Sequence, residues 1–425
     1  MNNVVGFECV ECAHSYDVAE IEYICPVCGG NLDVLYDYDW IRKRLSRNSL
    51  LADPDFSMWR YRALLPIAET SCVPPLAIGW TPVYHCPRLA SQYGIGELLI
   101  KDEGRNPTGS LKDRPSALAV VKAREAGQDV VATASSGNAG SALAGMCASM
   151  QLKSVIFVPS NIPAAKLAQL QIYGAKIVMV EGTYDQAYDL CLAAAHEFNW
   201  YQRNTGHNPY MTEGKKTAAL EIAEQLNWQV PDKVFVAMGD GCIIGGLWKG
   251  FCDLNQLGLI ERLPQLIGVQ AENAAAIVTA LTGFGSASES TGRTIADSIC
   301  VGKPRDATKA LRAIRESAGF GIKVSDDHIL AAMSELARAT GVFVEPSSAA
   351  TFAGFVKSCG EGNVKSDDRV LLLLTGNGLK DVEAVLRTTD IPNCYPPTLE
   401  GFMDQLKKND FDLSTSSQKQ VASLP

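Results

Sequence analysis

The chain has 425 residues, 47% of them hydrophobic and 20% charged, so it is long enough for two or three domains and can bury a large core. Its 47 acidic residues outnumber its 38 basic residues, and the net charge of −9 argues against nucleic acid or an anionic membrane as the main partner. No apolar stretch approaches the roughly 18 residues of a spanning helix, and we expect no secretory signal. The thirteen cysteines are mostly scattered singly, which is typical of reduced thiols, so we expect a cytoplasmic protein.

Residues 1–37 form a cysteine-rich segment that predicts a small ribbon. Two C-x-x-C pairs are separated by twelve residues, and this spacing predicts a structural zinc site made by Cys9, Cys12, Cys25 and Cys28. A metal-free ribbon with reduced thiols is the alternative. The segment contains acidic residues but no Lys or Arg, so we interpret it as structural and not as a nucleic-acid reader.

From about residue 96, short apolar runs alternate with longer amphipathic stretches. This alternation predicts an α/β fold in which parallel sheets are covered by helices on both faces. The strongest strand predictions are residues 97–103, 129–135, 154–160, 175–182, 233–239, 265–272 and 369–376.

A lysine stands where a predicted helix begins in the segment NPTGSLKDR, residues 106–114. The positive end of the helix dipole and partial burial would lower the pKa of the Lys112 amine and make it nucleophilic. A Schiff base with an aldehyde cofactor is one use of such an amine. An exposed lysine in a capped turn is the alternative, and this motif alone favours it.

Two further strand–helix loops offer small residues and free backbone amides. In TASSGNAGSALA, residues 133–144, the helix start suits a carboxylate or a phosphate. In MGDGCIIGG, residues 238–246, glycines allow successive amides to approach a phosphate. Each loop could instead be an ordinary cap or turn. The second loop matches neither the P-loop nor the G-x-G-x-x-G spacing, so a nucleotide site is not favoured.

A fourth motif, LLLLTGNGLKD at residues 371–381, places Thr375 at the carboxyl end of a predicted buried strand, where open α/β sheets bind ligands. Its hydroxyl could face a ring nitrogen or only cap the turn. Taken in order, the four motifs closely resemble the threonine synthase-like family of fold type II pyridoxal-phosphate enzymes, the tryptophan synthase beta superfamily. VFVEPSSAATFAGFVK and NPYMTEGKKTAALEIAEQL extend this resemblance, which runs from about residue 80 to 385.

The resemblance implies two open parallel-sheet domains behind the ribbon. The large domain would comprise residues 38–116 and 204–394, the smaller α/β domain residues 117–203, and a C-terminal tail residues 395–425.

The resemblance also implies roles for individual residues. Lys112 would carry pyridoxal 5'-phosphate and later move protons, Asn138 would bond the ring hydroxyl, and Thr375 would face the pyridine nitrogen. The amides expected to hold the cofactor phosphate belong to Gly239, Asp240, Gly241, Cys242 and Ile243. The residues expected to bind the substrate are Ser135, Ser136, Gly137 and Asn208.

The chain departs from the family pattern where the substrate's own phosphate is expected. Ala139 and Met211 replace the usual Thr and Arg, and Gly206 interrupts the usual Asn-Ser-x-Asn-Pro segment. Losing the arginine removes a permanent charge suited to phosphate. Arg203, His207 and Lys215 are nearby in the sequence and could compensate. From the altered pattern alone we expect weak turnover of O-phosphohomoserine and better use of an uncharged or differently activated amino acid.

We therefore expect a pyridoxal-phosphate-dependent carbon–oxygen lyase that performs elimination or replacement at the β or γ carbon of a small amino acid. Formation of threonine from O-phosphohomoserine is the leading candidate. The alternatives are dehydration of serine or threonine, β-replacement of the cysteate synthase kind, and a non-catalytic amino-acid sensor. The joint presence of Lys112, Asn138 and Thr375 argues against the sensor. We also expect a homodimer, although no motif carries that expectation.

Overall fold

The computed structural model describes residues 3–20, 23–283, 293–389 and 394–408. The chain divides into a first unit, Met1–Val385, and a second unit, Leu386–Pro425. In the second unit, helix α15 (Leu399–Lys408) occupies part of the segment expected to be a tail, and residues 409–425 lie outside the described residues. The first unit contains three sheets and all the predicted site residues.

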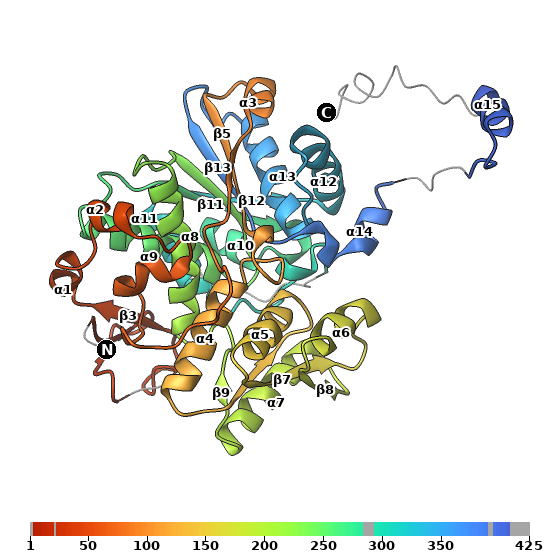
Figure 1. Ribbon diagram of the computed structural model, residues 1–425. Helices are drawn as coiled ribbons and strands as arrows, with labels where there is room; N and C mark the ends of the chain where they lie inside the picture. The colour runs from red at the N-terminus through yellow and green to blue at the C-terminus, as the bar shows by residue number, and fades with distance from the viewer. Residues whose placement is uncertain (1–2, 21–22, 284–292, 390–393, 409–425) are drawn as a thin grey trace. The chain divides into compact units, whose positions relative to one another are not determined.

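A six-stranded sheet forms the centre of the larger domain, in the order β12-β11-β10-β13-β5-β4 (Figure 1). All its strand pairs are parallel except β4–β5. The strands are β4 (Val83–His85), β5 (Glu97–Asp102), β10 (Lys233–Ala237), β11 (Gln265–Ala271), β12 (Gly321–Val324) and β13 (Arg369–Leu374). The expected α/β fold is confirmed, although the sequence did not predict the short edge strands β4 and β12.

Strand β10 shows why the apolar runs lack a polar face. Val234 and Val236 point into one hydrophobic core, and Phe235 and Ala237 point into another. Both faces of the sheet are therefore buried, as expected when helices cover a parallel sheet on each side. The helices that bury the two faces are α4 (Asp113–Glu125), α8 (Tyr210–Gln225), α9 (Cys242–Gln256) and α11 (Ala307–Glu316) on the first, and α3 (Pro87–Tyr93), α12 (Asp326–Thr340) and α13 (Pro346–Gly360) on the second.

A four-stranded parallel sheet, in the order β8-β7-β6-β9, forms the smaller domain (Figure 1). Its residues again alternate between two small cores, with Val155 and Phe157 on one face and Ile156 and Val158 on the other. The elements are β6 (Val130–Ala134), β7 (Lys153–Pro159), β8 (Lys176–Val180), β9 (Tyr201–Gln202), α5 (Asn138–Ser149), α6 (Ala164–Gln171) and α7 (Tyr184–Glu197).

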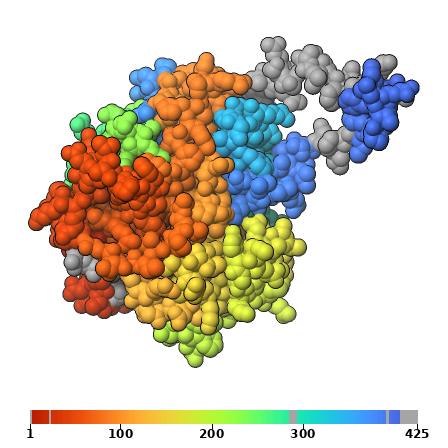
Figure 2. Space-filling view, in the orientation of Figure 1, coloured from red at the N-terminus to blue at the C-terminus, as the bar shows by residue number. Residues whose placement is uncertain are grey.

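The N-terminal ribbon is a three-stranded antiparallel sheet packed on the larger domain. Its strands are β1 (Val4–Cys9), β2 (Ser15–Tyr16) and β3 (Leu32–Tyr36). Asn31 Nδ2 donates to the carbonyl of Arg305 at 2.7 Å, and Lys309 Nζ donates to the carbonyl of Leu32 at 2.8 Å. In Figure 2 the N-terminal residues, in red, lie next to the orange residues that follow them in the sequence.

The remaining elements are short. They are α1 (Tyr38–Arg42), α2 (Arg47–Ala52), α10 (Ala276–Thr282), α14 (Val382–Leu386) and 3-10 helices at Met58–Leu64, Glu103–Arg105, Glu272–Ala274, Asp297–Ile299 and Gly378–Lys380. Among the described residues, no helix combines the length and apolarity needed to cross a membrane.

Candidate active site

The turn that carries Lys112 is held by its own polar side chains. Asp113 accepts hydrogen bonds from the backbone N–H of Thr108, at 2.7 Å, and from the Thr108 hydroxyl. Asn106 Oδ1 accepts from the N–H of Gly79 at 2.9 Å. Because these bonds satisfy the turn locally, Lys112 is the N-cap residue of α4 without having to cap the helix with its own side chain.

The Lys112 turn is also joined to the Thr375 turn. The N–H of Leu111 donates to the carbonyl of Thr375 at 2.9 Å, and the N–H of Asn377 donates to the carbonyl of Gly109 at 3.0 Å. Two motifs more than 250 residues apart in the sequence therefore form one hydrogen-bonded layer at the carboxyl end of β13.

A cavity of about 640 Å³ brings nearly all the predicted site residues together. It is lined by residues of both α/β domains, as expected for a ligand site in an α/β protein. The predicted residues in its lining are Lys112, Ser135, Ser136, Gly137, Asn138, Gly239, Asp240, Gly241, Cys242, Ile243 and Thr375.

The environment of Lys112 favours its neutral amine. Burial lowers the pKa of Lys112, and the positive charges of Lys215 and Arg203 lower it further, while Glu345 acts in the opposite direction. A neutral amine is the form that attacks an aldehyde and accepts a proton. The chemistry expected of Lys112 therefore matches its surroundings.

The glycine loop before α9 suits a phosphate. Gly241 has a φ of +95°, and a Cβ at this position would lie 2.8 Å from the carbonyl oxygen of Asp306. Helix α9 begins at the next residue, so its unsatisfied N–H groups and the positive end of its dipole lie at the cavity wall. This cradle fits the phosphate of pyridoxal 5'-phosphate.

Asn138 faces a carboxylate that the sequence did not single out. Its Nδ2 atom donates to both Glu345 oxygens, at 3.0 and 2.8 Å, and the Ser347 hydroxyl donates to Glu345 Oε1 at 2.9 Å. Burial raises the pKa of Glu345, although these hydrogen bonds and the Lys112 charge oppose the change. Glu345 lies in the VFVEPSSAA segment, so the resemblance contained it without indicating its role.

Thr375 lies at the cavity with its hydroxyl oxygen 3.3 Å from that of Ser348. A hydroxyl here can share a hydrogen bond with a neutral ring nitrogen, as the family resemblance implies.

The structure does not bring Asn208 into the cavity lining, contrary to the substrate-binding role expected for it. Its Nδ2 atom donates to the carbonyl of Gln202 at 2.7 Å and to the Tyr201 hydroxyl at 3.0 Å, and its Oδ1 accepts from the N–H of Tyr210. Asn208 is buried and supports the start of α8. The motif predicts the backbone of this segment but not the direction of the Asn208 side chain, and this direction keeps Asn208 out of the cavity lining.

The three departures from the family pattern occupy different environments. Ala139 lines the cavity, whereas Met211 is 1% exposed and belongs to the hydrophobic core. Gly206 has a φ of +73°, and a Cβ there would lie 2.5 Å from Cβ of Arg305. Only Ala139 of the three contributes to the cavity lining.

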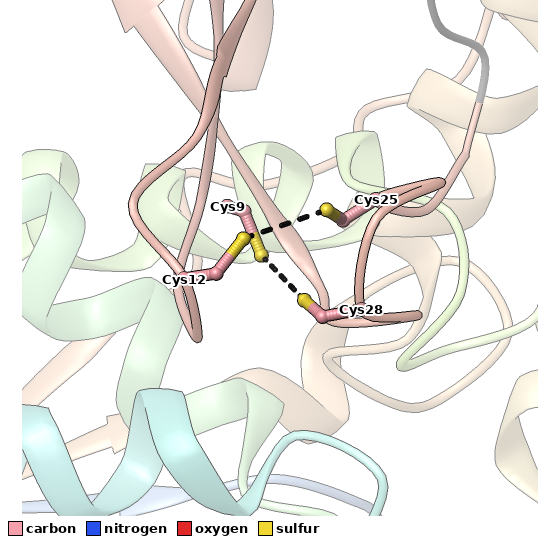
Figure 3. Close-up of side chains that lie close together, drawn as sticks. All are labelled: Cys9, Cys12, Cys25 and Cys28. Atoms are coloured by element: carbon pink, nitrogen blue, oxygen red, sulfur yellow. Dashed lines mark hydrogen bonds between the residues drawn. The ribbon is translucent and has the colours of Figure 1, made fainter.

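The four ribbon cysteines converge at one point (Figure 3). Their Sγ atoms all lie within 4.8 Å of one another, with 3.5 Å between Cys9 and Cys28 and 3.7 Å between Cys12 and Cys25. Zinc–sulfur bonds of about 2.3 Å in a tetrahedron place the sulfur atoms about 3.8 Å apart. The cluster therefore has the size that a tetrahedral metal ion requires.

Known proteins share both the sequence and the fold. Residues 75–376 match the family described as pyridoxal-phosphate dependent enzyme. This chain belongs to that family. It is 41% identical over 387 residues to the threonine synthase of Methanocaldococcus jannaschii, covering 90% of this chain and 95% of that protein. It is 38% identical over 404 residues to the threonine synthase of Methanosarcina acetivorans, covering 94% and 98%.

Solved structures of pyridoxal-phosphate enzymes have the same fold. A diaminopropionate ammonia lyase from Escherichia coli has a TM-score of 0.63 at 19% identity, covering 79% of this chain and 93% of that one. A threonine deaminase from Solanum lycopersicum has a TM-score of 0.62 at 21% identity, covering 83% and 89%. Together with the threonine synthase relatives, these matches confirm that the chain is a pyridoxal-phosphate-dependent lyase of the threonine synthase-like family, with the fold type II architecture.

Proposed function

We propose that this enzyme converts O-phosphohomoserine and water to threonine and inorganic phosphate. The observation that carries the proposal is the cavity in which Lys112, the glycine loop and the Ser135–Gly137 loop face one another. The two threonine synthases that cover almost the whole chain support this reaction over a dehydratase or a β-replacement reaction.

Each part of the cavity has a task in this reaction. Pyridoxal phosphate, when bound, supplies an electron sink that acidifies the carbon next to the substrate amine. The Lys112 amine, with its lowered pKa, takes that proton and returns protons later. The amides of the Ser135–Gly137 loop at the start of α5 hold the substrate carboxylate. The β carbon loses one proton and the phosphate group leaves the γ carbon, which gains a proton and becomes a methyl group, and a hydroxyl from water is added at the β carbon.

Product analysis tests this proposal. The purified enzyme with pyridoxal phosphate should release threonine and phosphate in equal amounts from O-phosphohomoserine, with kcat/KM in the usual enzyme range of about 10⁴–10⁸ M⁻¹s⁻¹. Parallel assays should offer serine, threonine, and O-phosphoserine with sulfite. Faster formation of a keto acid from serine or threonine, or of cysteate from O-phosphoserine, would replace the proposed reaction with one of the alternatives.

We also propose that the ribbon binds one zinc ion through Cys9, Cys12, Cys25 and Cys28. The convergence of four sulfur atoms at tetrahedral spacing supports this assignment. Elemental analysis of protein purified under reducing conditions without chelator should find one zinc per chain. A Cys12→Ser variant should lose the metal, while Cys72→Ser, which changes an exposed cysteine outside the cluster, should keep it. Absence of zinc from the unmodified protein would contradict the assignment.

We further propose that the enzyme is a cytoplasmic homodimer whose partners are small amino acids and not nucleic acid or membranes. The acidic net charge supports the choice of small-molecule partners, and the mostly scattered cysteines support the cytoplasmic location. Light scattering should give twice the chain mass, and a monomer at micromolar concentration would contradict the dimer.

A further inference from the structure

Two buried cations near Lys112 lack part of their hydrogen bonding. Lys215 on α8 and Arg203 after β9 are 0% and 1% exposed. Within the described residues, nothing accepts a hydrogen bond from Lys215 Nζ or from Arg203 Nη2. The other Arg203 nitrogens are occupied, since Nε donates to the Ser116 hydroxyl and Nη1 to the Thr205 hydroxyl, both at 3.1 Å. A buried charge without a partner is costly, so proteins retain one mainly where a ligand provides the partner.

Close packing of α8 against α9 places Lys215 next to Gly246, in the first turns of α9. A Cβ at Gly246 on α9 would lie only 2.9 Å from Cβ of Lys215, so the glycine lets α8 and α9 approach closely. The charge of Lys215 acts on Cys242, the first residue of α9, and lowers its pKa against the larger effect of burial. Lys215 therefore lies beside the helix start that already offers its N–H groups to an anion.

Arg203 reaches the same region from the smaller domain. It lines the cavity, and its positive charge, like that of Lys215, acts on Lys112. Two basic side chains from different elements thus lie near one helix N-terminus and one reactive amine. The buried carboxyl in this part of the lining belongs to Asp240, whose pKa is raised mainly by burial, so it is a weak counter-charge.

His207, the third cation considered from the sequence, belongs elsewhere. Its ring lies 5.1 Å from that of Tyr23 in the ribbon, and it lines a separate cavity beside α7. Burial lowers the pKa of His207 to about 4, so its ring is neutral at physiological pH. Of the three basic residues considered, Lys215 and Arg203 therefore remain as replacements for the arginine that the family usually has at the position of Met211.

We propose that Lys215 and Arg203 form a binding site for a phosphate monoester dianion. Such a group carries enough charge and enough acceptor oxygens for both unpartnered donors. The dianion is either the phosphate of the cofactor or the phosphate of the substrate, and in the second case the site rests on the proposed function. The proposed site does not use the position of the family arginine, because Met211 occupies that position and lies in the hydrophobic core.

The test compares Lys215→Met and Arg203→Met with Lys216→Met. Lys216 is the matched control because it is the next residue on α8, equally buried, and ion-paired to Glu213 and Asp253 at 2.6 Å. Without cofactor, Lys215→Met should unfold at an equal or higher urea concentration than the unmodified protein, because the substitution removes an unpaired buried charge. Lys216→Met should unfold at a lower concentration, because it removes the 2.6 Å ion-pair partner of two buried carboxylates and leaves them with weaker ones.

Binding measurements then distinguish the two phosphates. Loss of a charge-assisted contact should weaken binding of the responsible dianion by about thirtyfold or more. If the dianion is the cofactor's, both variants lose affinity for pyridoxal phosphate but not for pyridoxal, which lacks the phosphate. If it is the substrate's, pyridoxal phosphate binding is kept, whereas inorganic phosphate binding to the cofactor-loaded protein weakens. A Lys215→Gln variant, which keeps a polar side chain, provides a second measurement if Lys215→Met does not fold.

Two results would overturn the site. One is that neither the affinity ratio of pyridoxal phosphate to pyridoxal nor the affinity for inorganic phosphate changes in Lys215→Met, Lys215→Gln or Arg203→Met. The other is that Lys215→Met lowers stability as much as Lys216→Met, which would mark Lys215 as structural. Failure of the proposed function is separate, because the unmodified enzyme would then not turn over O-phosphohomoserine while the binding differences persist.

Discussion

Two neighbouring lysines on helix α8 are both removed from solvent but have different surroundings. Lys216 lies 2.6 Å from carboxylate oxygens of Glu213 and Asp253. Lys215 has no hydrogen-bond acceptor among the described residues, and it packs against α9 beside Gly246. The same residue type at adjacent positions therefore serves two purposes, and the presence or absence of a protein partner separates them.

A second group of fully paired buried charges surrounds Arg114, two residues after Lys112 on α4. Arg114 donates to Glu103 through Nε and Nη2, both at 2.7 Å, and to Glu221 through Nη1 and Nη2, both at 2.6 Å. Lys101 also donates to Glu221, at 2.8 Å. Every charge in this layer meets an opposite one, which holds α4, α8 and β5 together. Buried charge that is fully paired indicates structure, and buried charge that is unpaired at a cavity indicates a ligand.

Among substitutions in the cavity, Lys112→Ala should have the largest effect on cofactor binding and on kcat. The variant should lose the visible absorption band of lysine-bound pyridoxal phosphate, and kcat should fall by about 10²–10⁴-fold or more, because the amine that moves protons is gone. Lys122→Ala on the same helix is the control and should keep the band. Borohydride reduction and peptide mapping identify the bound lysine, and labelling of a lysine other than Lys112 would contradict the assignment.

Arg114→Met removes the cation that pairs with Glu103 and Glu221 in the buried layer. The substitution leaves Glu103 and Glu221 buried with fewer partners, so the free energy of unfolding should fall by about 3–5 kcal/mol. Urea denaturation measures the change. Arg105→Met, at an exposed position two residues beyond Glu103, should change stability by no more than about 0.5 kcal/mol. A similarly small change for Arg114→Met would show that the paired layer does not stabilise the fold.

Asp113 has features of both regions: it follows Lys112, and among the described residues its buried carboxyl accepts hydrogen bonds from Thr108 and from no cation. Burial raises the pKa of Asp113 from 3.8 to about 6, although the Thr108 bonds oppose the change. The folded state therefore binds more protons than the unfolded state, and this carboxyl makes stability fall as pH rises from about 4 to about 6.

Asp113→Asn removes that contribution. The stability of the variant relative to the unmodified protein should increase between about pH 4 and about pH 6 and then stay level. Urea denaturation across this range measures the difference, with the exposed Asp129→Asn as control. A constant difference between Asp113→Asn and the unmodified protein would mean that this carboxyl does not retain its proton in the fold.

The smallest effect is expected at the partly exposed rim of the cavity. Lys166 Nζ lies 2.6 Å from Asp297 Oδ2, and the Asp297 side chain is 53% exposed. Solvent screens such a pair, so Lys166→Met should change the free energy of unfolding by less than about 1 kcal/mol. The change should shrink further in about 1 M salt. A loss as large as that expected for Arg114→Met would show that exposure does not distinguish the two kinds of ion pair.

The parts of the fold that the sequence predicted are those with strong local patterns. Six of the seven long apolar runs became strands that are buried on both faces and need no polar alternation, whereas β8, at the edge of its sheet, is only partly buried. The edge strands β4, β9 and β12 were missed because they contain only two to four residues, too few for a recognisable period. Most of the candidate site was also predictable, because glycines, a cysteine spacing and a lysine at a strand–helix turn are local signals.

The sequence by itself determined the alternation of strands and helices and the likeness to pyridoxal-phosphate enzymes, and this likeness predicts Lys112 as the reactive amine. Only the tertiary structure decided that Glu345 faces Asn138, that Asn208 and His207 lie outside the main cavity, that Arg203 lines it, and that Lys215 packs against α9. The physical reason is that a motif defines the backbone of one segment. The direction of a side chain and its choice of partner depend on packing against segments that are distant in the sequence.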